Sequence, residues 1–214
     1  VFAGTSMGAI IAVAHIQNQT FQKSHHSLKN FVIKYAKEFK GMNYVEVHKK
    51  SSQSFLENLS YSFSHAKQVL AFLRKTHLED STLLDNIVAD FIYPCNLEDL
   101  NKKLYVSSID FKTGQVVFAQ KGNAQMAVKA SMSIPGYFPP VLHENKMLYD
   151  AQAAYPVPIQ IFAKDPVDFL ISADVSLPVN KSFHASNGID LLFRQTDILF
   201  HHVVSEVHAR KTSY

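Results

Sequence analysis

Cysteine is almost absent from this sequence, since Cys95 is the only one among 214 residues. A single thiol excludes a disulfide within the chain and a metal site built on several thiolates. Long apolar runs are also missing, and none reaches the roughly 18 residues that a membrane-spanning helix needs. These absences exclude a disulfide-stapled scaffold, a thiolate zinc domain and a transmembrane segment within these residues.

A large excess of positive or negative charge is missing as well. The net charge is +3 with histidine neutral, which is too small for the concentrated basic surface of a nucleic-acid-binding protein. Apolar residues make up 47% and charged residues 18%, as in a folded globular domain rather than a disordered one. We therefore expect no nucleic-acid partner, and a chain long enough for one α/β domain with its own core.

What the sequence does contain is apolar periodicity of two kinds. Helical spacing predicts helices over residues 7–17, 27–39, 53–73, 81–91, 124–131 and 188–210. Apolar and β-branched runs predict one hairpin over 104–120, a second over 142–149 and a buried central strand over 167–175. Strands separated by helical segments predict a three-layer α/β/α sandwich with a mostly parallel central sheet. Residues 27–93 are expected to form a helical flank or cap.

The first chemical motif is Gly4-Thr5-Ser6-Met7-Gly8, which matches G-x-S-x-G between an apolar strand end and an apolar helix. A tight strand-to-helix turn makes a serine hydroxyl project towards an activating base. The new helix points its first amide groups at the same place, where they can stabilise an oxyanion. We expect Ser6 to be a nucleophile supported by Gly4, Met7 and Gly8. The alternative is a small-residue turn that only packs a helix onto a sheet.

A second motif, Ala130-Ser-Met-Ser-Ile-Pro-Gly-Tyr-Phe-Pro-Pro-Val141, precedes a hairpin and Tyr149-Asp150-Ala151. Together with the serine turn, it resembles the patatin family of lipid acyl hydrolases, whose stretch reads A-S-x-S-x-P-x-x-F-P-P before a catalytic aspartate. The matching residues are Ala130, Ser131, Ser133, Pro135, Phe138, Pro139 and Pro140. The two motifs lie in the family's order, and the resemblance covers nearly the whole chain.

The resemblance implies a patatin-like fold and a Ser-Asp dyad, in which Asp150 takes the proton of Ser6 without a histidine between them. The implied substrates are fatty-acyl esters of phospholipids or related lipids, with no cofactor and no metal. A carboxylate near its ordinary pKa of ~3.9 is a weak base, so the site must favour proton transfer by its geometry or environment. Ser131 and Ser133 are expected to pack the loop beside this site.

Three features depart from the family pattern. Ala151 and Gln152 replace glycine-rich residues after the aspartate, and alanine costs about 1 kcal/mol or more where φ is positive. The family's glycine-rich oxyanion loop, with its basic residue, precedes the serine turn and is not among these residues. The family also continues for a further strand and helix. We therefore expect one patatin-like domain over 1–214, truncated at both ends, with little or no activity on its own.

Two other functions stay open. One is a non-catalytic patatin-like module for binding or scaffolding, in which Ala151 marks decay of the site. The other is a Ser-His-Asp esterase, for which Asp174 followed by His184 or His201 has the required order.

The expected partner is a lipid or phospholipid substrate, and the expected location is the cytoplasm or the surface of a membrane. Peripheral membrane contact would involve Phe21, the pair His25-His26 and the aromatic and basic stretch 31–44. A solvated helix face is the plainer interpretation of the same residues.

Overall fold

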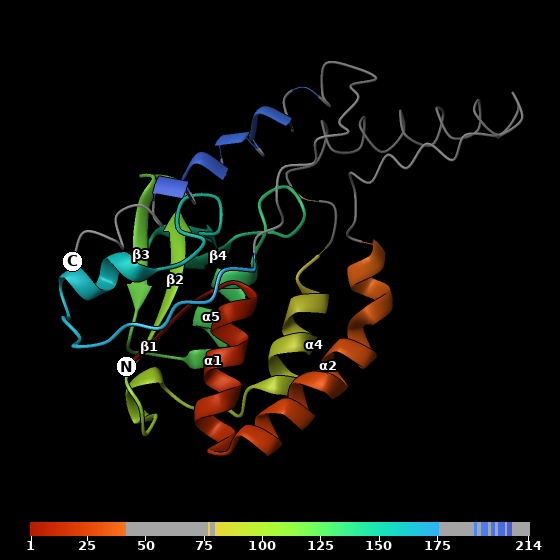
Figure 1. Cartoon of the computed structure of the whole chain (residues 1–214). Coiled ribbons are helices and arrows are strands. Elements are labelled where there is room, and N and C mark those ends of the chain that lie inside the picture. The colour runs from red at the N-terminus through yellow and green to blue at the C-terminus, as the bar shows by residue number, and fades with distance from the viewer. Residues whose placement is uncertain are drawn as a thin grey trace, which may run out of the picture.

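The computed structural model describes residues 1–41, 77, 80–175, 191, 194–196, 198–199, 201–203 and 205–206. In this part of the chain, helices pack against a single mixed sheet, which confirms the expected α/β fold class (Figure 1). The strands are β1 (Phe2–Thr5), β2 (Leu104–Asp110), β3 (Gln115–Ala119), β4 (Val141–His143) and β5 (Lys146–Asp150). The helices are α1 (Met7–Asn18), α2 (Phe21–Gly41), α4 (Thr82–Phe91) and α5 (Ala124–Met132), with short 3₁₀ turns η1 (Leu97–Asp99) and η2 (Ile159–Ala163).

The arrangement of strands around β2 determines where the site forms. β3 pairs antiparallel with residues 106–110 of β2 and occupies one edge. The opposite edge is shared: β1 runs parallel beside residues 104–107, and β5 runs antiparallel beside residues 108–110. β1 and β5 therefore lie end to end along the same edge, and their carboxyl ends meet.

The sheet is mixed rather than mostly parallel. Among the described strands, only β1 and β2 pair in parallel, while the pairs β2–β3, β2–β5 and β4–β5 are antiparallel. Two of these antiparallel pairs, β2–β3 and β4–β5, are the predicted hairpins, since a short connection between neighbouring strands forces them to run in opposite directions. Both hairpins are confirmed: Glu144 and Asn145 form the second turn with φ of 46° and 63°, as a tight type I′ turn requires.

The core lies between the helices and one face of the sheet. α1 packs on β1 and α5 packs on β2, while α2 and α4 cover these helices from outside (Figure 1). α1 is buried on nearly all sides, as its sequence predicts. The fully buried side chains of this core include Ile10, Val13, Leu84, Ile87, Val128 and Phe138.

Most predicted helices are confirmed within the described residues. α1, α4 and α5 begin and end close to the expected positions, and α2 begins at Phe21 rather than near residue 27. The described residues from 191 to 206 are helical, in agreement with the helix expected over 188–210. The helix expected over 53–73 lies outside the described residues, so a continuous flank over 27–93 stays a prediction.

The central strand predicted over 167–175 is wrong. The segment is not a strand, and its apolar side chains are exposed, with Phe169 at 80% and Ile171 at 83%. Apolar composition favours burial, but a strand also needs a neighbour whose backbone accepts and donates its hydrogen bonds. The described sheet consists of β1 to β5, and this segment is not one of its strands.

Candidate active site

The backbone at Ser6 is strained. Ser6 connects β1 directly to α1 with φ of 54° and ψ of −124°, a conformation that costs a non-glycine residue about 1–3 kcal/mol. This is the strand-to-helix turn that G-x-S-x-G predicts. A Cβ atom at Gly4 would lie 2.6 Å from Ala9 N and 2.6 Å from Gly8 O, whereas one at Gly8 would contact nothing within 4 Å. Only the first glycine of the motif is therefore required by packing.

Asp150 is the last residue of β5 and lies beside Ser108, while Thr5 lies beside Ser107 on the same edge of β2. The residue after Thr5 is Ser6. Neighbouring register positions on one strand thus bring Ser6 and Asp150 together, although they are far apart in the sequence.

Burial changes the chemistry of the Asp150 carboxyl. Asp150 is 5% exposed, and its Oδ1 accepts a hydrogen bond of 2.8 Å from the backbone N–H of Gln152. Burial raises the pKa of Asp150 to about 6, against smaller lowering effects of the Ser6 hydroxyl and the Gln152 amide. A buried carboxyl with this pKa is a stronger base than an exposed one.

The Ser6 side chain faces this carboxyl without completing a hydrogen bond. The hydroxyl is near enough to lower the pKa of Asp150, yet Oδ2 has no hydrogen-bond partner of normal geometry among the described residues. The two side chains are therefore close, but they are not aligned for a hydrogen bond of normal geometry. One carboxylate oxygen is held by Gln152, and the other remains available to Ser6.

The second motif contributes contacts to both residues. Ser131, fully buried at the end of α5, accepts a hydrogen bond of 2.8 Å through its Oγ from the backbone N–H of Ser6. The carbonyl of Ser133 accepts a hydrogen bond of 2.9 Å from the backbone N–H of Asp150. The sequence interpretation, that these serines pack beside the site, missed these specific contacts. The sequence offered one signal for these contacts: two small polar residues, Ser131 and Ser133, stand at the end of an otherwise largely apolar helix.

A further buried hydroxyl pair fixes the strand that carries Ser6. Thr5 Oγ1 donates to the carbonyl of Tyr155 at 2.9 Å and lies 2.6 Å from Ser107 Oγ. The pair links β1, β2 and the segment that follows Asp150. Nothing in the spacing of the sequence indicated it, because the three residues are separated by long stretches of chain.

The replacement of glycine by Ala151 introduces no backbone strain. Ala151 is not among the residues with positive φ, and it is fully buried. Its carbonyl accepts hydrogen bonds from the backbone N–H groups of Ala154 and Tyr155, at 3.0 and 2.7 Å. The strain considered from the sequence is therefore absent, and the adjacent carboxyl keeps its bond to Gln152.

The first amide groups of α1 are candidate oxyanion donors. α1 begins at Met7, so the N–H groups of Met7 and Gly8 have no acceptor within their own helix. The N–H of Ala9 already donates to the carbonyl of Ser6 at 2.9 Å. Helix N-termini carry partial positive charge that stabilises an anion nearby.

The alternative triad would combine a serine with Asp174 and either His184 or His201. Asp174 and His201 are both half-buried, and each makes an interaction within the protein. His184 lies outside the described residues. The pKa of Asp150 is affected by burial, by Ser6 and by Gln152, and not by a described histidine.

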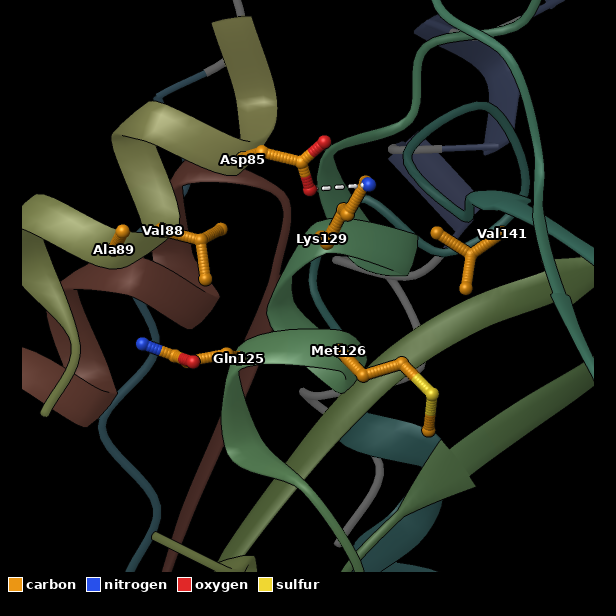
Figure 2. Close-up of a pocket in the computed structure, with 7 residues that line it drawn as sticks. All are labelled: Asp85, Val88, Ala89, Gln125, Met126, Lys129 and Val141. Atoms are coloured by element: carbon orange, nitrogen blue, oxygen red, sulfur yellow. Dashed lines mark hydrogen bonds and ion pairs between the residues drawn. The ribbon is translucent and has the colours of Figure 1, made fainter. Parts of the chain in front are cut away.

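A cavity of about 290 Å³ lies between α4 and α5 (Figure 2). The ion pair of Asp85 and Lys129 lies at its edge, with apolar Val88, Met126 and Val141 around it. Neither Ser6 nor Asp150 lines this cavity. It is therefore separate from the pair of Ser6 and Asp150.

Comparison with known proteins identifies the family of this chain. The model of the patatin-like phospholipase family matches residues 1–163. An uncharacterized NTE family protein of Mycobacterium bovis is 29% identical over 109 residues, which is 51% of this chain and 18% of that protein. A counterpart in Mycobacterium tuberculosis has the same identity and coverage. The aligned region is thus a small part of these relatives. Because the family match covers most of the sequence and includes both motifs, the chain belongs to the patatin-like phospholipase family.

Proposed function

We propose that this chain forms the catalytic core of a lipid acyl hydrolase, with Ser6 as nucleophile and Asp150 as general base. Membership of the patatin-like family supports a lipid hydrolase. The observation that carries the proposal is the buried Asp150 carboxyl, with a pKa of about 6 and a free Oδ2 facing a strained serine. A base whose pKa approaches the working pH is most effective in proton transfer.

The reaction proceeds in two steps. Asp150 takes the Ser6 hydroxyl proton while Oγ attacks the ester carbonyl carbon, and the amides of Met7 and Gly8 stabilise the oxyanion. The bond to the alcohol breaks, and Asp150 returns the proton to that leaving oxygen. Water then gives a proton to Asp150 and attacks the acyl carbon. Ser6 leaves, recovers the proton, and the fatty acid is released.

Labelling with a fluorophosphonate tests the nucleophile directly. The full-length protein that contains this chain is expected to be labelled, and Ser6→Ala to abolish labelling, because the probe bonds only to an activated oxygen. Mass spectrometry of the labelled peptide provides the measurement. Ser24→Ala is the matched control, since Ser24 is also a buried serine but lies near the opposite end of α1. Labelling that survives Ser6→Ala excludes Ser6, and a protein that is never labelled supports the non-catalytic module.

We also propose peripheral contact of α2 with an anionic membrane surface. Val32 and Ile33 are 60% and 65% exposed on α2, with Lys29 and Lys37 exposed near them. Among the described helices, none combines the length and apolarity that a membrane span requires. Exposed apolar residues flanked by lysine are typical of helices that lie in the interface.

Co-sedimentation with phosphatidylserine vesicles tests this contact. The double substitution Val32→Asp and Ile33→Asp is expected to weaken binding at least about tenfold, because two apolar side chains no longer enter the interface. Leu142→Asp is the control, since Leu142 is 72% exposed on a different element. Equal binding by the double variant and the unchanged protein contradicts the proposal and leaves α2 a solvated helix.

A further inference from the structure

The end of α5 contacts both candidate catalytic residues through their backbones. Ser131 Oγ accepts a hydrogen bond of 2.8 Å from the backbone N–H of Ser6. Two residues later, the carbonyl of Ser133 accepts a hydrogen bond of 2.9 Å from the backbone N–H of Asp150. One short segment thus connects the serine turn to the aspartate strand, independently of the pairing of both with β2.

The Ser131 hydroxyl is used differently from that of its neighbour Ser133. Ser133 Oγ donates to the carbonyl of Lys129, four residues earlier. This local bond is the usual choice of serine in a helix. Ser131, by contrast, accepts a hydrogen bond from a residue on a different element. Its hydroxyl therefore links α5 to the turn between β1 and α1.

The contact falls on a residue whose backbone is strained. Ser6 has φ of 54° and ψ of −124°, and such a conformation persists only when surrounding contacts impose it. Ser6 lies between the end of β1 and the first residue of α1, and an N–H at this position has no acceptor within the helix that follows. Ser131 supplies this acceptor from a fully buried position.

We propose that Ser131 is a positioning residue, which holds the backbone of Ser6 so that its hydroxyl faces Asp150 Oδ2. The inference rests on the proposed function of Ser6 and Asp150. It also leaves the amide of Ser6 out of the oxyanion donors, because that amide is already bound to Ser131. A displacement of about 1 Å at a reacting atom costs on the order of 10²-fold in rate. Loss of the Ser131 contact is therefore expected to lower the rate of the reaction by displacing Ser6.

Amide exchange measures this contact without any need for activity. Ser131→Ala is expected to speed hydrogen exchange at the Ser6 amide by about tenfold, the effect of one net hydrogen bond. Ser131→Thr keeps the acceptor oxygen and is expected to keep the protection. Ser24→Ala is the control for loss of a buried hydroxyl elsewhere. Unchanged exchange at Ser6 in a folded Ser131→Ala protein overturns the proposal.

Kinetics separate positioning from a merely structural role. In the full-length protein, Ser131→Ala is expected to lower kcat and the rate of fluorophosphonate labelling by about 10-fold to 100-fold, with little change in KM. Ser131→Thr should restore both rates. If alanine prevents folding, Ser131→Cys gives the same comparison, since sulfur is a weak acceptor. Labelling of Ser131→Ala at the unchanged rate refutes the inference alone, whereas a protein never labelled at Ser6 refutes the proposed function and the inference together.

Discussion

Asp150→Asn is expected to lower turnover by about 10²–10⁴-fold, because the amide cannot take the proton of Ser6. The same substitution is expected to make the folded protein more stable at neutral pH. Both effects come from one carboxyl, which is 5% exposed and has a pKa raised by burial to about 6. Loss of rate with gain of stability is the pattern expected of a group kept for function.

The sign of the stability effect follows from the raised pKa. Between pH 3.8, the ordinary value, and about pH 6, the unfolded chain loses the Asp150 proton while the folded chain keeps it. The free energy of unfolding therefore falls as pH rises through this window, and the cost is complete above pH 6. A shift of about two units corresponds to about 3 kcal/mol, of which Asn should recover on the order of 2 kcal/mol at pH 7.

Denaturant unfolding at pH 4 and pH 7 measures this difference, and ester turnover over the same range measures the rate. The stability gain of Asp150→Asn should be near zero at pH 4 and largest at pH 7. Turnover of the unchanged protein should rise with pH, with a midpoint near pH 6 set by Asp150. Full turnover of Asp150→Asn, lost on replacing a histidine such as His184, would instead establish the Ser-His-Asp triad.

Gly4→Ala is expected to destabilise the fold by about 3 kcal/mol and to abolish labelling of Ser6. The added Cβ would lie 2.6 Å from three backbone atoms at the start of α1. Backbone cannot move aside as a flexible side chain can, so α1 must shift relative to β1. That shift displaces Ser6, which lies between the two elements.

Gly8→Ala is the matched control within the same motif. A Cβ there meets nothing within 4 Å, and alanine inside a helix is more favourable than glycine by up to about 1 kcal/mol. Thermal unfolding and circular dichroism of both variants provide the comparison. Equal destabilisation by the two substitutions would show that the tight approach at Gly4 is not what restricts this position.

Local patterns in the sequence predicted the elements that depend on near neighbours. The helix after Ser6 and the two hairpins are present because apolar spacing and turn residues act over a few positions. The segment 167–175 shows the limit of this reasoning. Its apolar run resembles a central strand, yet it is exposed and is not a strand of the described sheet, since strand formation depends on a neighbouring strand as well as on apolar composition.

The candidate site also depends partly on local sequence and partly on tertiary structure. The sequence by itself determined the serine turn and, through the family resemblance, the choice of Asp150 as its partner. Only the tertiary structure decided that β1 and β5 share one edge of β2, so that Ser6 and Asp150 meet. It also decided that burial raises the pKa of Asp150 and that Ser131 holds the Ser6 amide. These properties depend on distant segments packed around one point, and no local pattern of residues contains that information.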